Sequence, residues 1–397
     1  MRFSIDIGYP ENQMKKNWER WVAWKKYNYT DRVRVEAGIE TRNMLTARGV
    51  TWPDYMDNVE DHYYHQLLNQ KWRIENIPDD FCMEPEIMVL PDTQNCVAAA
   101  FGAEITLYEN DAPYVHGNIK TPDDVEKMEV PKPTEGYWGK VLDWYQKMVE
   151  LAENTKITFN GKPGRIRIGV KEISDPLTIC YDLVGSDIYY WIYDYPETLE
   201  KLLDKVIEGY LGWMDYSRKV TGNSGQVMYS GGDGGSILNV EQYKRFIMDR
   251  YLKIWSIHPG EKFFHMCGEM RHLLPIIRDV YKIDEFYGFG YQVESEIVGE
   301  ELGGYCRLLG NLNPMLIAEG PVEKIKHEAE HCLETLACYG GHCLCDGYNI
   351  PPGTPVEHIR AMVSAAEEYG KPKITKGPIA SGERIPNQNP PLKRAFH

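Results

Sequence analysis

The amino-acid sequence of this 397-residue chain predicts an α/β protein, a (β/α)8 TIM barrel with a helix-rich N-terminal extension. Three observations support this prediction. Strand-like and helix-like segments alternate from residue 165 onward, eight strand-like segments occur in all, and glycine-flanked polar residues follow several of them. Such alternation indicates a parallel sheet, and eight units close most simply into a barrel. An open doubly wound sheet is the alternative, but no glycine-rich phosphate fingerprint follows the first strand.

The N-terminal region, residues 1–80, is predicted to be mostly helical and to include the first barrel strand. Residues 32–38 alternate in polarity and end on a glycine, as a half-buried strand does. A second strand is expected at 86–90, before Pro91, and a short extra strand at 101–108. The expected helices of this region are 11–26, 40–48 and 57–71.

The remainder of the barrel is predicted to occupy residues 81–370, followed by a proline-rich, basic C-terminal extension at 371–397. Residues 137–155 form an amphipathic helix by their 3.6-residue apolar period. The other six strands are expected at 165–170, 226–230, 262–267, 284–290, 305–310 and 341–345. The helices that follow them are expected at 176–187 with 196–218, 240–257, 269–281, 295–302, 322–339 and 355–369.

Composition excludes several classes of protein. The formal net charge of -15, with no basic stripe, argues against nucleic-acid binding. No apolar run approaches the roughly 18 residues that cross a membrane, and no apolar segment follows Arg2 as in a secretion signal. We therefore expect a cytoplasmic protein whose nine cysteines are reduced and free to bind metal.

The stretch Phe263-Phe264-His265-Met266-Cys267-Gly268 is the first candidate for chemistry. Alternate side chains of a strand point the same way, so His265 and Cys267 share one face. An imidazole and a thiolate on one face supply half of a tetrahedral zinc site. The alternative is a buried strand with a hydrogen-bonded histidine and an inert cysteine.

Other polar residues follow neighbouring strands, at the barrel face where active sites lie. Asp233 follows the fourth strand within a glycine-rich run, and it is a candidate catalytic residue. Tyr287 and Asn311 end the sixth and seventh strands and are candidates for cofactor binding. Glycine-rich strand ends are also common in turns, and Asp233 could instead cap the next helix.

Several motifs occur together in the order found in a known superfamily. They are His265-Met266-Cys267-Gly268, Gly310-Asn311-Leu312-Asn313-Pro314, Gly340-Gly341-His342, Ile350-Pro351-Pro352-Gly353-Thr354-Pro355, and the segment from Ala361-Met362 to Tyr369-Gly370. From about residue 29 to residue 370 the chain resembles the uroporphyrinogen decarboxylase superfamily, in particular its corrinoid-dependent methyltransferase branch. The resemblance implies a TIM barrel. The tetrapyrrole decarboxylases have a Met-Arg-Gln-Ala-Gly type segment, and Val35 replaces its arginine here, which argues against uroporphyrinogen as the substrate.

The resemblance also implies a zinc site. The methyltransferase branch binds zinc through a His-x-Cys on strand five, which His265 and Cys267 match, and through a distant cysteine after strand eight. That cysteine normally precedes a Pro-x-Thr-Pro segment by four residues, where this chain has Tyr348. Cys345, nearer the catalytic end of strand eight than Cys343, is therefore the expected third ligand, while Cys343 is expected to be a small buried side chain.

The implied reaction moves a methyl group between a methylated small molecule and the cobalt of a corrinoid. Zinc could polarise the heteroatom that bears the methyl group or hold a thiol acceptor as thiolate. The altered third-ligand position favours demethylation of a substrate, and the 10 tryptophans and 27 tyrosines favour a methoxyaromatic compound, hence O-demethylation in anaerobic metabolism. None of the 11 histidines lies in an Asp-x-His-x-x-Gly motif, so a separate partner protein is expected to supply the methylcorrinoid or Co(I) corrinoid.

Two other functions stay open from the sequence. A metal-free decarboxylase of another acid would need arginines inside the barrel mouth, and Arg165, Arg167 and Arg307 are the candidates. A zinc- or corrinoid-handling protein without turnover would keep the barrel and lose the reaction.

Overall fold

The computed structural model describes residues 3–378, except 92–95, 110, 172, 224–226, 258–259, 348 and 372. Within this part of the chain, seven parallel strands form the main sheet in the order β2-β14-β13-β12-β11-β10-β9. The strands are β2 (Arg34–Val35), β9 (Ile173–Ser174), β10 (Val227–Gly231), β11 (Glu261–His265), β12 (Glu285–Tyr287), β13 (Arg307–Leu312) and β14 (His342–Asp346).

A second parallel pair completes the barrel. β3 (Glu86–Val89) pairs with β8 (Arg165–Ile168), and β9 follows β8 within a few residues, so that β8 and β9 together act as the third barrel strand. The segment before β3 contacts β2, because the Asp80 amide donates to the Val35 carbonyl at 2.8 Å. The predicted TIM barrel is thus confirmed, with all eight expected strands near their expected positions.

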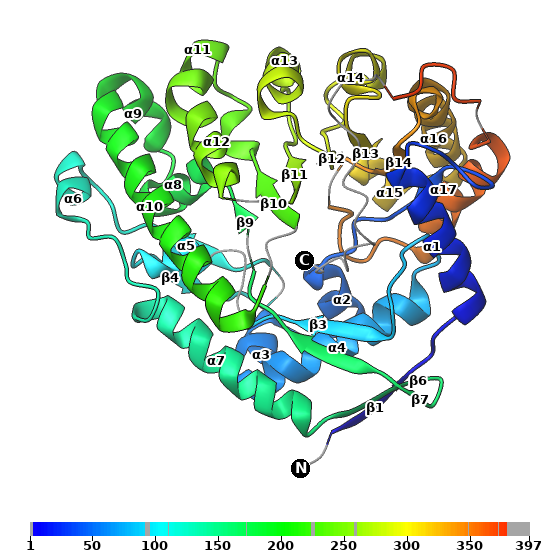
Figure 1. Ribbon diagram of the computed structural model, residues 1–397, viewed down its shortest axis with the longest axis horizontal. Coiled ribbons are helices and arrows are strands. Elements are labelled where there is room, and N and C mark those ends of the chain that lie inside the picture. The colour runs from blue at the N-terminus through cyan, green and yellow to red at the C-terminus, as the bar shows by residue number, and fades with distance from the viewer. Residues whose placement is uncertain are drawn as a thin grey trace.

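Helices lie along the outer side of the main sheet, as Figure 1 shows for the segments coloured green to orange. They are α8 (Pro176–Val184), α9 (Ile188–Asp194), α10 (Pro196–Thr221), α11 (Val240–Tyr243) continuing through η2 (Lys244–Met248) into α12 (Asp249–Ser256), η3 (Arg271–Leu273) continuing through α13 (Leu274–Ile276) into η4 (Ile277–Tyr281), α14 (Ser295–Leu302), α15 (Pro314–Glu319), α16 (Val322–Leu336) with η5 (Ala337–Tyr339), and α17 (Val356–Tyr369). The predicted helices are all present near their expected bounds, because their apolar periods are regular, whereas the short helices α9 and α15 were not predicted.

The N-terminal region is helical as predicted, with the short helix α3 and one strand in addition to the expected elements. Its helices are α1 (Glu11–Lys25), α2 (Thr41–Arg48), α3 (Trp52–Met56) and α4 (Val59–Asn76). The unexpected strand is β1 (Ser4–Ile7), which pairs in parallel with β6 (Lys156–Phe159) beside β7 (Lys162–Pro163). Its partner is about 150 residues away, so local periodicity gave no sign of the pairing.

The connecting region contains β4 (Glu104–Thr106), the short strand expected within 101–108, and β5 (Tyr114–His116), which pairs with it antiparallel. Its helices are α5 (Cys96–Ala100), α6 (Pro122–Lys127) and α7 (Gly136–Glu153), the last of which was expected at 137–155. The domain bounds at residues 80 and 370 stay predictions. Among the described helices, none combines the length and apolarity that a membrane span requires.

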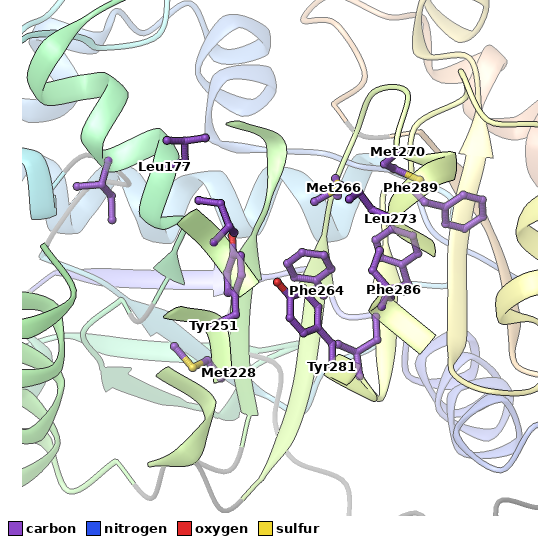
Figure 2. Close-up of a cluster of buried hydrophobic side chains, with 14 of the residues drawn as sticks. Leu177, Met228, Tyr251, Phe264, Met266, Met270, Leu273, Tyr281, Phe286 and Phe289 are labelled. Atoms are coloured by element: carbon purple, nitrogen blue, oxygen red, sulfur yellow. The ribbon is translucent and has the colours of Figure 1, made fainter. Parts of the chain in front are cut away.

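A buried aromatic cluster sets the orientation of β11. Phe264 stacks on Phe286, its register partner on β12, with ring centroids 6.0 Å apart. Tyr251 of α12 and Tyr281 of η4 meet Phe264 edge-on (Figure 2). Phe264 therefore points out of the barrel toward the helices. Because strand side chains alternate, the next residue, His265, points into the barrel.

Candidate metal centre and cavity

His265 is the last residue of β11, and its side chain is held in one orientation. Its Nδ1 donates to the carbonyl of Tyr287, its register partner on β12, at 2.8 Å. A carbonyl can only accept, so Nδ1 has the hydrogen and Nε2 faces away from it. Nε2 lies 3.3 Å from Oδ1 of Asp233. A histidine fixed this way presents Nε2 as a ligand atom.

Asp233 begins η1 (Asp233–Gly235), two residues after β10 ends. Its Oδ1 accepts a hydrogen bond from the Cys267 amide at 2.8 Å. The N-cap position of η1 is Gly232, and Asp233 is the first residue of the helix. The Asp233 carboxylate therefore joins the ends of the neighbouring strands β10 and β11. The Asp233 side chain is 44% exposed.

Asp233, His265 and Cys267 form a group of potential metal ligands, with one ligand atom from each residue within 4.8 Å of the other two. β11 ends at His265, so Cys267 lies just beyond the strand, yet the two predicted ligands remain together. Nitrogen, sulfur and oxygen donors of this kind are those that zinc binds. Within the described residues, no other set of three such side chains meets this distance criterion.

The three groups perturb one another electrostatically. Burial lowers the pKa of His265, but the hydrogen bonds and charges of Asp233 and Cys267 outweigh it and raise this pKa to about 10. Burial raises the pKa of Asp233, and the hydrogen bond and charge of His265 overcome this effect, so that the pKa is lowered. In the metal-free chain His265 and Asp233 are therefore an ion pair. A metal would have to displace the proton on Nε2.

A cavity of about 520 Å³ opens beside this group, and Asp233, His265 and Tyr287 line it. The sequence predicted these three residues near the barrel mouth. It did not predict the wall that comes from the N-terminal helices α2 to α4, which includes Arg42, Trp52, Tyr55, His62 and Gln70. Only the helical character of that region was visible in the sequence.

Cys345, the expected third zinc ligand, lies outside the group of three. Its thiol donates to Oδ1 of Asp346 at 3.6 Å, and it packs in an apolar cluster with Trp24 and Cys343. Burial and the Asp346 charge hold the pKa of its thiol well above the ordinary range. Cys343 is fully buried, as expected. Tyr348 lies outside the described residues, so the identity of a third ligand stays a prediction.

The two predicted cofactor-binding residues lie in different surroundings. The Tyr287 ring lies 5.3 Å from the His265 ring, measured between centroids, and faces the cavity. The Asn311 amide is engaged within the chain, because Oδ1 accepts from the Ser295 hydroxyl at 2.9 Å and Nδ2 donates to the Val293 carbonyl at 3.3 Å. Their roles in cofactor binding stay predictions.

The arginines proposed for a decarboxylase are all paired with carboxylates. Arg165 and Arg167 contact Glu86, at 3.4 and 3.5 Å. Arg307 is 1% exposed and lies 3.2 Å from a Glu261 oxygen. None of the three is part of the cavity lining given by the described residues.

Comparison with known proteins places these features in context. The chain matches the uroporphyrinogen decarboxylase (URO-D) family over residues 82–369. It is 28% identical over 204 residues to the methylcobamide:CoM methyltransferase MtaA of Methanosarcina barkeri, a match that covers 49% of this chain and 56% of that protein, about half the length of each. It is 24% identical over 301 residues to the uroporphyrinogen decarboxylase of Chloroherpeton thalassium, covering 72% and 78% of the two chains.

Among solved structures, a methyltransferase from Methanosarcina mazei is similar to this chain. The TM-score is 0.63 at 24% sequence identity, and the superposition covers 89% of this chain and 99% of the other. At this identity the likeness shows a shared fold.

Proposed function

The chain belongs to the uroporphyrinogen decarboxylase family, and we propose that it is a zinc-dependent methyltransferase of that family. The proposed reaction moves a methyl group between a methylated substrate, first of all a methoxyaromatic compound, and the cobalt of a corrinoid bound to a separate protein. The observation that supports it most directly is the meeting of Asp233, His265 and Cys267 at the cavity. The similarity to a methylcobamide:CoM methyltransferase supports methyl transfer in particular.

The donor set fits zinc. His265 and Cys267 are the proposed ligands, and Asp233 or Cys345 is the third. Three protein ligands leave a fourth position open, which is typical of catalytic zinc. Bound zinc would supply a Lewis acid for the heteroatom that bears the methyl group, or hold a thiol acceptor as thiolate.

The residues of the chain perform the other tasks. The Tyr287 carbonyl orients His265 through Nδ1. Asp233 bonds to the amide of Cys267 and thereby keeps the loop after β11 close to β10. Where Cys345 is the third ligand, the Asp233 carboxylate, whose pKa is lowered, remains available to orient the substrate. Tyr287, Trp52 and Tyr55 offer aromatic surfaces to a methoxylated ring.

A second candidate function is a metal-free decarboxylase acting on another acid. The longer alignment, which covers 72% of this chain, is to a uroporphyrinogen decarboxylase. The paired state of Arg165, Arg167 and Arg307 weakens this candidate, because a substrate carboxylate would have to displace Glu86 or Glu261.

One experiment separates the candidates. Protein purified anaerobically without chelator is analysed for zinc and then assayed for transfer of methyl from methoxyaromatic compounds to reduced cobalamin. About one zinc per chain together with cobalt methylation is expected. Zinc without transfer would indicate a protein that only handles zinc or corrinoid, whereas wild-type protein that binds no metal would favour the decarboxylase.

A further inference from the structure

The cavity has two chemically different walls. One wall contains the potential metal ligands Asp233 and His265, together with Asp175 and Asp182 of the α8 region. The other comes from the N-terminal helices α2, α3 and α4. The first wall has three carboxylates. The second has the Arg42 guanidinium and one carboxylate, Glu40 at the N-cap of α2, which lies 2.8 Å from the Asn349 amide.

Arg42, the second residue of α2, is the unusual member of the second wall. Its Nε is buried and has no hydrogen-bond partner, and among the described residues its guanidinium forms no hydrogen bond or ion pair. Neighbouring arginines are engaged: Arg48 donates to Oδ1 of Asn69, and Arg73 pairs with Asp79 at 2.6 Å. A partly buried cation without a partner is destabilising, and a ligand that supplied an anion would relieve that cost.

Gln70 of α4 is a second unpartnered group in the same wall. Its side chain is only 9% exposed, and its buried Oε1 has no hydrogen-bond partner among the described residues. Gln66, one turn earlier on α4, differs, because its amide donates to the Leu90 carbonyl at 2.8 Å and accepts from the Leu90 amide at 2.9 Å. Gln66 therefore has a structural role, whereas the Gln70 amide can rotate to offer either oxygen or nitrogen to a ligand.

We infer that Arg42 and Gln70 anchor an anionic group of the substrate, and that the substrate is a methoxylated aromatic carboxylate. Arginine binds a carboxylate through two parallel hydrogen bonds, and the Gln70 amide adds a third donor. The carboxylates on the other wall repel the anion, so the methoxy end of the ring faces His265. A cavity of about 520 Å³ is of the size that holds a small ligand.

The aromatic part of this inference comes from two rings of the second wall, Trp52 and Tyr55, and from Tyr287 beside His265. Trp52 and Tyr55 form an edge-on pair with centroids 5.6 Å apart, and both line the cavity with Tyr287. A small aliphatic anion, such as a thiol sulfonate, would satisfy Arg42 but would leave these rings uncovered. That the substrate carries a methoxy group rests on the proposed function, whereas the anion site rests on Arg42 and Gln70 alone.

The test is calorimetric binding of three probes to the full chain: 4-methoxybenzoate, the neutral 4-methoxybenzamide, and 2-mercaptoethanesulfonate. Wild type is expected to bind 4-methoxybenzoate at least about tenfold more tightly than the amide. Arg42→Met should remove this preference without weakening amide binding, and Gln70→Leu should reduce it partly. Lys171→Met, which removes the lysine of the cavity lining, is the matched control and should retain most of this preference.

Several results would overturn the inference. They are equal affinity of wild type for the acid and the amide, no measurable binding of the acid, or an Arg42→Met variant that keeps the preference. A preference lost in Lys171→Met but kept in Arg42→Met would move the anion site to Lys171. Tighter, Arg42-dependent binding of the sulfonate would overturn the aromatic class. Circular dichroism melts show whether each variant is folded.

Binding and turnover separate this inference from the proposed function. Arg42-dependent binding of the acid without any methyl transfer would leave the anion site standing and defeat the proposed function. Methyl transfer from neutral methoxyarenes, at a rate that Arg42→Met leaves unchanged, would support the proposed function and defeat the anion site.

Discussion

His265 and Tyr287 are register partners on adjacent parallel strands, and the main chain of Tyr287 accepts the Nδ1 hydrogen of His265 at 2.8 Å. The bond leaves Nε2 directed at Asp233, so a main-chain atom of β12 determines which imidazole nitrogen is available to a metal. A mutation of the Tyr287 side chain should not disturb this arrangement, since the acceptor is its carbonyl.

The first prediction concerns the His-x-Cys pair. His265→Ala and Cys267→Ser should each reduce zinc from about one per chain to nearly none, because each removes a ligand that metal binding requires. Cys343→Ser is the control: its side chain is fully buried and is expected to cost on the order of 1 kcal/mol of stability with zinc retained. Elemental analysis and thermal melts give both quantities. Full zinc in Cys267→Ser would exclude Cys267 as a ligand.

The second prediction identifies the third ligand. If Asp233 is the ligand, Asp233→Ala loses zinc and Cys345→Ser keeps it; if Cys345 is the ligand, the pattern is reversed. The geometry favours Asp233, whose carboxylate lies within 4.8 Å of the other two donors. Both variants are compared by zinc content at equal protein concentration. Retention of zinc in both would point to a ligand elsewhere.

The third prediction uses pH. Burial raises the pKa of Asp346 from 3.8 to about 6, so the native state binds this proton more tightly than the unfolded chain does. Its contribution to stability is complete below about pH 4 and is lost as the pH rises through 6. Asp346→Asn cannot ionise, and its oxygen can still accept from the Gly38 amide, which now donates to Oδ1 at 2.6 Å.

We therefore expect Asp346→Asn to match wild type near pH 4 and to be more stable at pH 7.5, by at most about 3 kcal/mol. Denaturant unfolding at the two pH values measures the difference. A stability difference that does not change with pH would contradict the assignment of this proton to Asp346.

The fourth prediction concerns the support beneath the site. Phe264→Ala should destabilise the protein by about 3–5 kcal/mol, because it opens a cavity among Tyr251, Tyr281 and Phe286. Tyr190→Ala, at an aromatic side chain that is 69% exposed, should change stability by less than about 0.5 kcal/mol. Urea denaturation compares them. A small effect at Phe264 would mean that β11 is not held by this cluster.

The fifth prediction is that a separate protein supplies the corrinoid. None of the 11 histidines lies in the base-off corrinoid-binding motif, so the purified chain is expected to lack tightly bound cobalamin. The absorbance spectrum of protein expressed with added cobalamin measures this directly. Stoichiometric cobalamin on the isolated chain would contradict it.

The sequence by itself determined the alternation of strands and helices, and with it the barrel. It also predicted that His265 and Cys267 would lie together, and they do, although β11 ends at His265 and the strand alternation behind that prediction does not extend to Cys267. The longer helices beyond residue 165, such as α10 and α16, were predictable because their apolar periods are local.

Only the tertiary structure decided which distant groups meet. Asp233 and Cys267 are 34 residues apart and are joined by a hydrogen bond that depends on the pairing of β10 with β11. Arg42 and Gln70 reach the cavity because α2 and α4 fold back across it, and β1 finds β6 across about 150 residues. Local patterns report the direction of a side chain relative to its own backbone. Contacts between remote segments depend instead on how the barrel closes. The closure also determines which polar side chains at the barrel mouth, such as Arg42 and Gln70, lack a hydrogen-bond partner among the described residues.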